Sequence, residues 1–396
     1  MAQQLAISIV TETFAPDING VATTWSYLID GLVDNGHCVE LVRPIPQLPT
    51  PPKPSVREIG VAGAPLPFYA NLRFGLPAKK LLLQHWHHHR PDVVHIVTEG
   101  PLGWTSMSAA LALGLPVSTS FHTNFHRYSH YYGYGWLGKP LLGYLRHFHN
   151  KAALTLVPTK ALGKELASRG FQRLAVLGRG VDAGFFSPKK RDVALRQSWG
   201  VLEDDLAIVY VGRLAVEKNI PLALKTFAAI QKLLPQAKMI IVGDGPMRQT
   251  ILQQYPGVVY CGHQHGEALA RHYASCDLLL FPSLSETYGI VILEAMASGL
   301  AVVAFDYGAA KEHILDRENG FLVPLGNEGQ FVKTAMMAAY HREEFKCIGQ
   351  AAHESALEHS WKHIVNQFEK RLFILSAIGA NSHVTKPRYA HTAPLP

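Results

Sequence analysis

Glu286 and Glu294 are separated by seven residues in a segment that follows the apolar run Leu278–Phe281. Glu286 falls in the loop after this expected strand, and Glu294 falls about one turn into the helix that follows. The residues that open this helix, where N–H groups lack intrahelical partners, are Gly289, Ile290 and Val291. Carboxylates accept hydrogen bonds from sugar and ribose hydroxyls, and a helix N-terminus binds phosphate. The segment therefore predicts a site for a ligand with phosphate and hydroxyl groups.

Two cations, Arg213 and Lys218, follow the apolar run Ala207–Gly212 and precede another helical pattern. Both side chains can reach the carboxyl edge of the sheet to which that run belongs. In an open parallel sheet, ligands bind outside this edge, and a departing nucleoside diphosphate needs its growing negative charge neutralised. Arg213 and Lys218 are therefore candidates for binding a diphosphate. A solvated pair on a surface loop is the alternative.

The first half of the chain has two candidates of its own. Gly20 lies in a loop rich in Pro, Asn and Gly, before a helical pattern that begins near Val21. Such a strand-to-helix turn offers N–H groups to phosphate, although ordinary αβ turns also use Asn-Gly. His122 follows the apolar run Val117–Phe121, where a lone histidine is most often a structural residue. Neither residue identifies a site by itself.

The elements that must position these residues alternate between short β-branched runs and amphipathic stretches. Strands are expected at Leu5–Val10, Cys38–Val42, Val93–Val97, Val117–Phe121, Leu154–Val157, Ala207–Gly212, Lys238–Val242, Val258–Tyr260, Leu278–Phe281 and Ala301–Ala304. Strand-helix alternation predicts parallel sheets covered by helices on both faces. The pattern restarts after a polar segment at 182–205, so two α/β domains joined by that linker are expected. Irregular structure is expected at 44–54, which contains six prolines.

The 396 residues include 37 Lys and Arg, 30 Asp and Glu, and four widely spaced cysteines. A chain of this length is expected to form two domains, and the cysteine spacing indicates reduced thiols rather than disulfides or a zinc site. No basic leader and no run of about 18 apolar residues is present, which predicts a cytoplasmic protein. The cluster His85, His87, His88 and His89 is interpreted as a basic helix end, so no metal is expected.

The excess of positive charge lies in the first half. Residues 1–190 contain 18 Lys and Arg against 10 Asp and Glu, whereas residues 191–396 contain 19 against 20. A basic half indicates a membrane surface, a phosphorylated acceptor or simply a soluble basic surface. Residues 126–139 mix Tyr and Trp with Arg, Lys and His, which suits bilayer headgroups, an acceptor sugar or the edge of a core helix. No zinc-finger spacing is present, so nucleic acid is not expected as a partner.

Taken in chain order, these motifs resemble the retaining glycosyltransferases of family four, which have the GT-B fold. The motifs are the Gly20 loop, His122-Thr123, Gly178-Arg179-Gly180-Val181-Asp182, Gly212-Arg213 with Glu217-Lys218, Gly243-Asp244-Gly245-Pro246, and the pair Glu286 and Glu294. The resemblance implies two Rossmann-like parallel-sheet domains that face a cleft, with a helix near 361–375 crossing back to the first domain. The implied boundaries are 1–185 for an acceptor-binding domain, 186–375 for a nucleotide-sugar-binding domain and 376–396 for a disordered tail.

The resemblance also implies a role for each candidate. Arg213 and Lys218 would bind the donor diphosphate, Glu286 the transferred sugar and Glu294 the ribose. The remaining donor contacts would come from the Gly20 loop and from Gly289, Ile290 and Val291, with His122 in the cleft near the sugar. The implied reaction moves a hexosyl group from a nucleoside-diphosphate sugar to an acceptor hydroxyl with retention and without a metal or other cofactor. Domain closure about 182–205 would assemble the site.

Within this family the chain resembles GDP-mannose-dependent α-mannosyltransferases and the branch that makes sulfolipid and glycosyl-diacylglycerol. The expected reaction transfers an α-mannosyl group from GDP-mannose to a lipid or glycan acceptor, with the basic first domain peripheral on the cytoplasmic membrane. The alternatives are a UDP-glucose- or UDP-glucuronate-dependent diacylglycerol glycosyltransferase, a sugar-nucleotide epimerase of the same fold, and a non-catalytic sugar-nucleotide-binding protein. Tyr288 stands where many relatives carry Phe, which leaves the glutamate pair intact.

Overall fold

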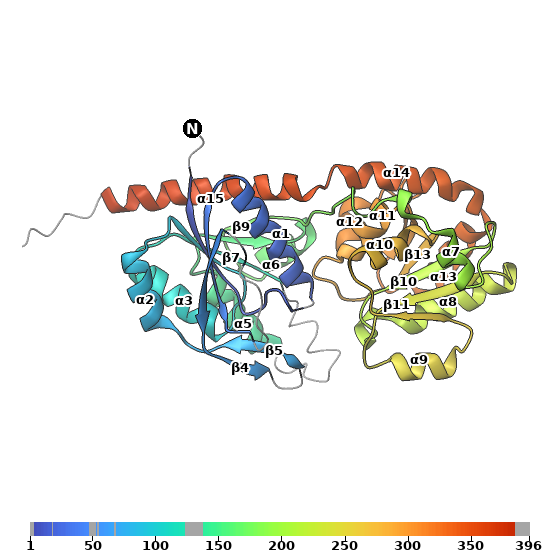
Figure 1. Ribbon diagram of the computed structural model, residues 1–396, viewed down its shortest axis with the longest axis horizontal. Coiled ribbons are helices and arrows are strands. Elements are labelled where there is room, and N and C mark those ends of the chain that lie inside the picture. The colour runs from blue at the N-terminus through green and yellow to red at the C-terminus, as the bar shows by residue number, and fades with distance from the viewer. Residues whose placement is uncertain are drawn as a thin grey trace, which may run out of the picture.

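The computed structural model describes residues 4–17, 19–46, 53, 55–66, 69–122 and 138–384. It contains two parallel sheets, each flanked by helices, which lie side by side in the molecule (Figure 1). This is the expected α/β architecture. Thr123 and nearly all of the aromatic and basic stretch at 126–139 lie outside the described residues, as does most of the proline-rich segment at 44–54.

The first sheet has seven strands in the order β3-β2-β1-β6-β7-β8-β9. The strands are β1 Ala6–Val10, β2 Cys38–Pro44, β3 Val56–Val61, β6 Val93–Ile96, β7 Val117–Ser120, β8 Leu154–Val157 and β9 Leu174–Val176. A separate antiparallel hairpin is formed by β4 Gly63–Leu66 and β5 Tyr69–Gly75. The flanking helices are α1 Gly20–Asp34, α2 Lys79–His88, α3 Pro101–Ala112, α5 Gly138–His149 and α6 Lys160–Ser168. Strand β1 lies between β2 and the much later β6, so a topological switch point follows it.

The second sheet has six strands in the order β12-β11-β10-β13-β14-β15. The strands are β10 Ala207–Val211, β11 Lys238–Val242, β12 Val259–Gly262, β13 Leu278–Phe281, β14 Ala301–Phe305 and β15 Phe321–Val323. The helices are α7 Val193–Ser198, α8 Ile220–Leu233, α9 Arg248–Gln254, α10 Gly266–Ala274, α11 Ile290–Ala297, α12 Ala309–His313, α13 Glu328–Tyr340 and α14 Phe345–Leu357, with 3-10 turns η2 Pro188–Lys190, η3 Val216–Lys218 and η4 Arg342–Glu344. Strand β10 lies between β11 and β13, which creates the second switch point.

The expected strands are all present, with ends within two residues of those predicted. Strands β3, β9 and β15 of the two sheets were not predicted, and neither was the hairpin of β4 and β5. β9 and β15 are only three residues long, too short for a periodic pattern. β3 lies at the edge of the first sheet, directly after the segment expected to be irregular, and Val61 alone of its six residues is buried.

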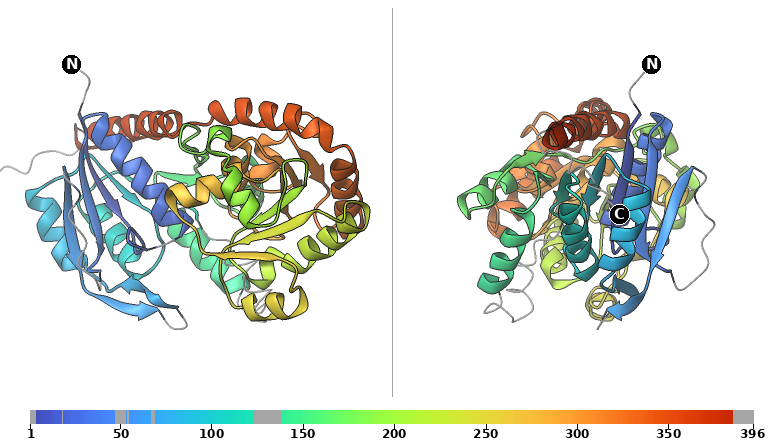
Figure 2. Two further views of the ribbon diagram at one scale, coloured as in Figure 1. Left: turned by 45° about the vertical axis from the view of Figure 1, so that its right-hand side comes forward. Right: turned by 90° about the vertical axis from the view of Figure 1, so that its left-hand side faces the viewer.

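Helix α15 (Trp361–Val384) crosses back to the first domain, as expected. It lies along that domain, while α14 lies over the second (Figures 1 and 2). Phe368 and Leu372 pack in the same core as Trp25 of α1, with the rings of Trp25 and Phe368 5.5 Å apart. The expectation of a disordered tail from residue 376 is wrong for its first part, because the helix continues and Gly379 is buried beside Pro116. No helix within the described ranges is long and apolar enough to cross a membrane.

The two segments that connect the domains lie next to each other. Val181 forms a parallel bridge with Ser360, and its N–H donates to the His359 carbonyl at 2.9 Å. The predicted linker at 182–205 is not a loose connection, because it packs against the second sheet. Its residues in that core are Phe186, Trp199 and Val201. The crossing therefore occurs at 178–181, before the polar segment that suggested a linker.

Candidate active site

The loop after β13 is held in place by backbone contacts. Gly289 has φ of 93° and caps α11, so a side chain at this position would be strained. The Tyr288 carbonyl accepts a hydrogen bond from Ala309 at 2.7 Å, and Gly308 leaves room for that close approach. The prediction that the helix opens at this glycine, with Ile290 and Val291 in its first turn, is confirmed. We call residues 282–289 the donor loop, after the sugar-nucleotide donor that the family resemblance leads us to expect there.

Lys218 and Glu286 form an ion pair at the carboxyl edge of the second sheet. Lys218 ends η3 after β10, and Glu286 lies in the donor loop after the neighbouring β13. Their side chains are 15% and 12% exposed. The fold therefore brings together two residues to which the sequence assigned different parts of one ligand.

Arg213 is anchored by a carboxylate that was quoted in the motif without a role. Its guanidinium donates to Glu217, whose side chain is fully buried, and its carbonyl accepts from Tyr210 at 3.1 Å. Burial alone would raise the pKa of Glu217, but the hydrogen bond and charge of Arg213 lower it overall. Glu217 is therefore a negatively charged support for Arg213, whose side chain remains 41% exposed at the sheet edge.

Glu294 lies one turn into α11, as predicted. The Tyr273 hydroxyl donates to its Oε2 at 2.8 Å, and burial raises the pKa of Glu294 to about 7. Across the domain boundary, burial and the charges of Asp182 and Glu294 raise the pKa of Tyr27 on α1. The charge of Glu294, in the second domain, therefore acts on a side chain of the first.

His122 occupies the end of β7 at the corresponding edge of the first sheet. Trp25 Nε1 donates to His122 Nε2 at 2.9 Å, so the proton of the neutral imidazole belongs on Nδ1. Arg179 Nη2 lies 3.3 Å from that Nδ1. Burial and the charge of Arg179 hold the pKa of His122 well below its usual value. Two hydrogen-bond donors therefore face each other, an arrangement that an acceptor atom placed between them would stabilise.

Arg179 is the main functional candidate that lies in one of the sequence motifs without a role predicted for it. Its buried guanidinium donates to the Gly20 carbonyl at 2.6 Å and to Thr24, and it lies 5.9 Å from the centre of the Tyr288 ring. Burial lowers its pKa to about 10. Arg179 thus connects the first-domain candidates Gly20 and His122 to the donor loop. A narrow pocket is lined by Trp25, His122 and Arg179 among other residues.

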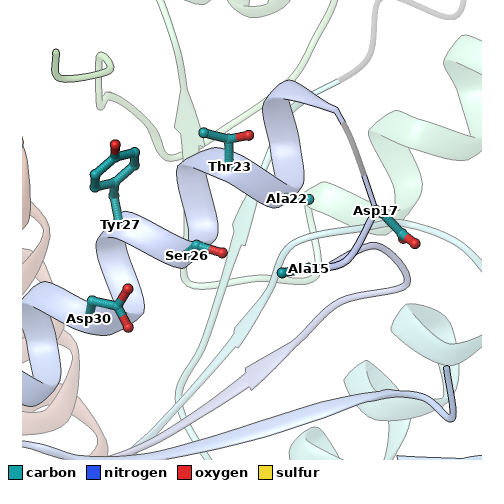
Figure 3. A pocket seen from close by; sticks show the side chains of 7 residues that line it. All are labelled: Ala15, Asp17, Ala22, Thr23, Ser26, Tyr27 and Asp30. Atoms are coloured by element: carbon teal, nitrogen blue, oxygen red, sulfur yellow. The ribbon is translucent and has the colours of Figure 1, made fainter. Parts of the chain in front are cut away.

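The Gly20 loop differs in detail from a turn with free donors. The Asn19 side chain caps α1 by accepting from Val21 N at 3.1 Å and Ala22 N at 2.9 Å. A Cβ at Gly20 would meet only Arg179, at 3.8 Å, so open space adjoins this residue. A second pocket of about 300 Å³ lies beside the same helix (Figure 3). It is lined by Ala15, Asp17, Ala22, Thr23, Ser26, Tyr27 and Asp30.

Two carboxyl groups that the sequence analysis did not identify follow strands of the first sheet. Glu12 follows β1 and accepts from Leu102 N at 3.0 Å at the start of α3. Glu99 follows β6, and its carbonyl accepts from the Tyr144 hydroxyl at 2.5 Å. Burial raises the pKa of each carboxyl to about 7. Their position just past strand ends was the available sequence signal.

The histidine cluster lies in and just after the last turn of α2, as interpreted. His85 Nε2 lies 2.5 Å from Glu40 Oε2, an acidic neighbour that the fold supplies from β2. Within the ranges that the structure describes, no group of three or more His, Cys, Asp or Glu side chains could hold a metal ion.

Comparison with known proteins places this arrangement in a family. A model described as Glycosyltransferase Family 4 matches residues 18–185, and one described as Glycosyl transferases group 1 matches residues 205–339. A GDP-mannose-dependent alpha-mannosyltransferase of Mycolicibacterium smegmatis is 33% identical over 90% of this chain and 94% of its own length. The chain belongs to glycosyltransferase family four.

Other family-four relatives differ in their named activities. Sulfoquinovosyl transferase SQD2 of Arabidopsis thaliana is 33% identical over 77% of this chain, which spans only 61% of that relative's length. An alpha-monoglucosyldiacylglycerol synthase of Streptococcus pneumoniae is 26% identical over 80% of this chain and 75% of its own length. The family is therefore established, and the donor is not fixed by these names.

Solved structures confirm the GT-B fold of this family-four chain. Sucrose-phosphate synthase from Thermosynechococcus elongatus superposes with a TM-score of 0.75 at 18% identity, over 95% of this chain and all of the other. Anabaena HepE, solved in complex with UDP and glucose, gives a TM-score of 0.72 at 19% identity, over 93% of this chain and 99% of its own.

Proposed function

We propose that this glycosyltransferase moves a hexosyl group from a nucleoside-diphosphate sugar to an acceptor hydroxyl with retention of anomeric configuration. The observation that carries the proposal is the cluster of Arg213, Lys218 and Glu286 at a topological switch point, with Glu294 one helical turn away. Cations suit a diphosphate, and two carboxylates suit the hydroxyls of a sugar and a ribose.

In this proposal Arg213 and Lys218 neutralise the departing diphosphate. Glu286 accepts hydrogen bonds from the transferred sugar, and Glu294 accepts them from the ribose. The bond between the anomeric carbon and the phosphate oxygen breaks as the bond to the acceptor oxygen forms, and the acceptor proton passes to the phosphate. The catalytic requirement is then preorganised positive charge, which the two cations and the α11 N-terminus supply without a metal or other cofactor.

His122 and Arg179 complete the site from the first domain. The proposed role of the His122 Nδ1–H and the Arg179 guanidinium is to donate to one oxygen of the donor, because the two nitrogens lie only 3.3 Å apart. Arg179 also holds the Gly20 carbonyl, so the Gly20 loop is fixed at the same edge. This loop is proposed to contact the donor phosphates once the domains close.

We propose GDP-mannose as the donor, because a relative named as GDP-mannose-dependent aligns with this chain over 94% of the relative's length. The proposed acceptor is a lipid or an envelope glycan, in keeping with the diacylglycerol product named for the streptococcal relative. Such an acceptor would bring the basic first domain to the cytoplasmic face of a membrane, where lysines and arginines favour anionic headgroups.

A thermal-shift screen against GDP, UDP, ADP and their sugar conjugates tests the donor, because a ligand of the folded state raises the melting temperature. A selective shift with GDP and GDP-mannose supports the proposal. A shift confined to UDP and UDP-sugars would replace mannosyl transfer by glucosyl or glucuronosyl transfer, consistent with UDP binding by HepE. Turnover is then tested by measuring sugar transfer to a lipid acceptor, with the sugar released by hydrolysis subtracted. Nucleotide binding without transfer would favour a non-catalytic protein.

A further inference from the structure

Tyr288 lies in the donor loop, two residues after Glu286, and its side chain is buried. Its hydroxyl makes two contacts: 3.2 Å to the Arg179 carbonyl and 2.7 Å to His313 Nε2. On the far side of the same imidazole, His313 Nδ1 lies 3.1 Å from His359 Nε2. The three side chains therefore form a continuous hydrogen-bonded chain.

The chemistry of the groups fixes the direction of this chain. A carbonyl only accepts, so the single Tyr288 proton points to Arg179 O. His313 must then donate from Nε2 to the tyrosine oxygen and accept at Nδ1 from His359. Burial lowers the pKa of His313 to about 3, so its imidazole is neutral and keeps the lone pair that this arrangement needs.

This hydrogen-bonded chain of side chains connects the donor loop to both segments that cross between the domains. Arg179 belongs to the first crossing, and its guanidinium holds the Gly20 carbonyl. His359 belongs to the second crossing, and its carbonyl accepts from Val181 of the first. Gly180 is packed so closely that an added Cβ would lie 2.6 Å from the backbone of Trp361. When the angle between the domains changes, residues that are in contact with these hydrogen-bonded side chains must therefore move.

We propose that Tyr288, His313 and His359 are positioning residues that couple occupancy of the donor loop to the angle between the two domains. The proposal deepens the proposed function, because it treats the nucleotide sugar as the ligand that Glu286 receives. A ligand that draws Glu286 into a new position moves Tyr288, and through it both crossings. The same coupling requires that loss of these hydrogen bonds weaken donor binding, since linkage between two equilibria is reciprocal.

Two variants interrupt the hydrogen bonds among Tyr288, His313 and His359 while keeping most of the packing. Tyr288→Phe removes the hydroxyl and retains the ring, and His313→Leu removes both ring nitrogens. His313→Gln is the conservative rescue, because a carboxamide donates from one atom and accepts at the other. Tyr340→Phe is the matched control, because it removes a hydroxyl from an exposed tyrosine of the same domain.

The distance between the domains can be measured with the chain's own thiols. Cys38 at the start of β2 and Cys347 in α14 are both exposed, one in each domain, whereas Cys276 is buried. Nitroxide labels on Cys38 and Cys347, in a Cys261→Ser background, give the interdomain distance distribution by pulsed electron paramagnetic resonance. The distribution is recorded without ligand and with saturating GDP or UDP.

The expected result is a broader ligand-free distribution for Tyr288→Phe and His313→Leu than for the unmutated chain and Tyr340→Phe. The donor KM should rise about tenfold, within the range usual for coupled sites, and His313→Gln should recover most of both losses. Distributions and KM values unchanged in Tyr288→Phe would overturn the inference. The inference would also be overturned if the activity of every variant fell in proportion to its amount of folded protein, because that result indicates a purely structural role. If no nucleotide binds, the proposed function fails, whereas the ligand-free distributions still decide whether the three residues hold the angle between the domains.

Discussion

The ammonium of Lys218 and the carboxylate of Glu286 neutralise each other although the two residues are 68 positions apart in the chain. Strands β10 and β13 are neighbours in the second sheet, so the loops that follow them meet at one edge. Both side chains are mostly buried, and each charge depends on the other for much of its stabilisation. The pair holds in place two groups that are proposed to bind the sugar nucleotide.

Lys218→Met should reduce kcat by about 100- to 1,000-fold, the usual cost of losing one group that stabilises transition-state charge. It should also lower the free energy of unfolding by about 1–3 kcal/mol, because the mostly buried Glu286 carboxylate loses its ion pair with the Lys218 ammonium. Steady-state kinetics and denaturant unfolding measure the two effects. The double variant Lys218→Met with Glu286→Gln should regain most of the stability and none of the activity. Recovery of activity in the double variant would contradict the assigned roles.

Glu294→Gln should stabilise the ligand-free protein at pH 8 while weakening donor binding. The pKa of Glu294 is raised from 4.5 to about 7 by burial, so its contribution to stability is fully present below pH 4.5 and lost as pH rises through 7. At pH 8 a buried charge is replaced by a neutral amide, with an expected gain of about 1–3 kcal/mol. The gain should vanish near pH 4.5. Equal unfolding midpoints for Glu294→Gln and the unmutated protein at pH 8 would show that the Glu294 carboxylate is well solvated.

Affinity for a sugar nucleotide should fall below pH 7, because ribose hydroxyls donate best to an ionised carboxylate. With the pKa of Glu294 about 7, binding at pH 6 should be up to about tenfold weaker than at pH 8. Calorimetry with an intact sugar nucleotide is the suitable measurement, since its diphosphate diester does not titrate in this range. Glu294→Gln provides the control and should bind weakly with a flat pH profile. A profile of the same slope in that variant would assign the effect to another group.

Gly31→Ala should weaken the docking of α15. A Cβ at this position of α1 would lie 2.9 Å from Val365 Cγ1 and closer still to Cγ2. Overpacking of this kind typically costs about 1–3 kcal/mol in the free energy of unfolding. Gly143→Ala in α5 is the matched control, because its Cβ would meet no atom of the described residues within 4 Å. It should be neutral or gain up to about 1 kcal/mol from helix propensity.

The sequence predicted the sheets well because a strand buried on both faces needs a continuous apolar run. Leu278–Phe281 and Ala207–Val211 are such runs, and each is fully buried. The loops after them could be located for the same reason. The linker was placed wrongly because 182–205 is polar in composition, yet three apolar residues at irregular spacing carry its packing. They are Phe186, Trp199 and Val201.

The role of Arg179 could not be predicted from spacing. Its partners Gly20, Thr24 and Tyr288 lie more than 100 positions away in the chain. Only the folded crossing brings the first two to the Arg179 guanidinium and the Tyr288 hydroxyl to its carbonyl. The Tyr288, His313 and His359 chain is missed for the same reason. Residues that act alone on well-marked loops can be identified from the sequence, whereas those that join elements distant in the chain require the fold.

The return of α15 to the first domain sets the order in which the chain can complete its structure during synthesis. Phe368 and Leu372 supply part of the core that also contains Trp25, so the first domain emerges from the ribosome with one wall of that core missing. The part of α1 that contacts α15 must stay uncovered while all of the second domain is translated. Residues 1–180 expressed as an isolated fragment should therefore aggregate, and the first domain becomes stable only when the last long helix has left the ribosome.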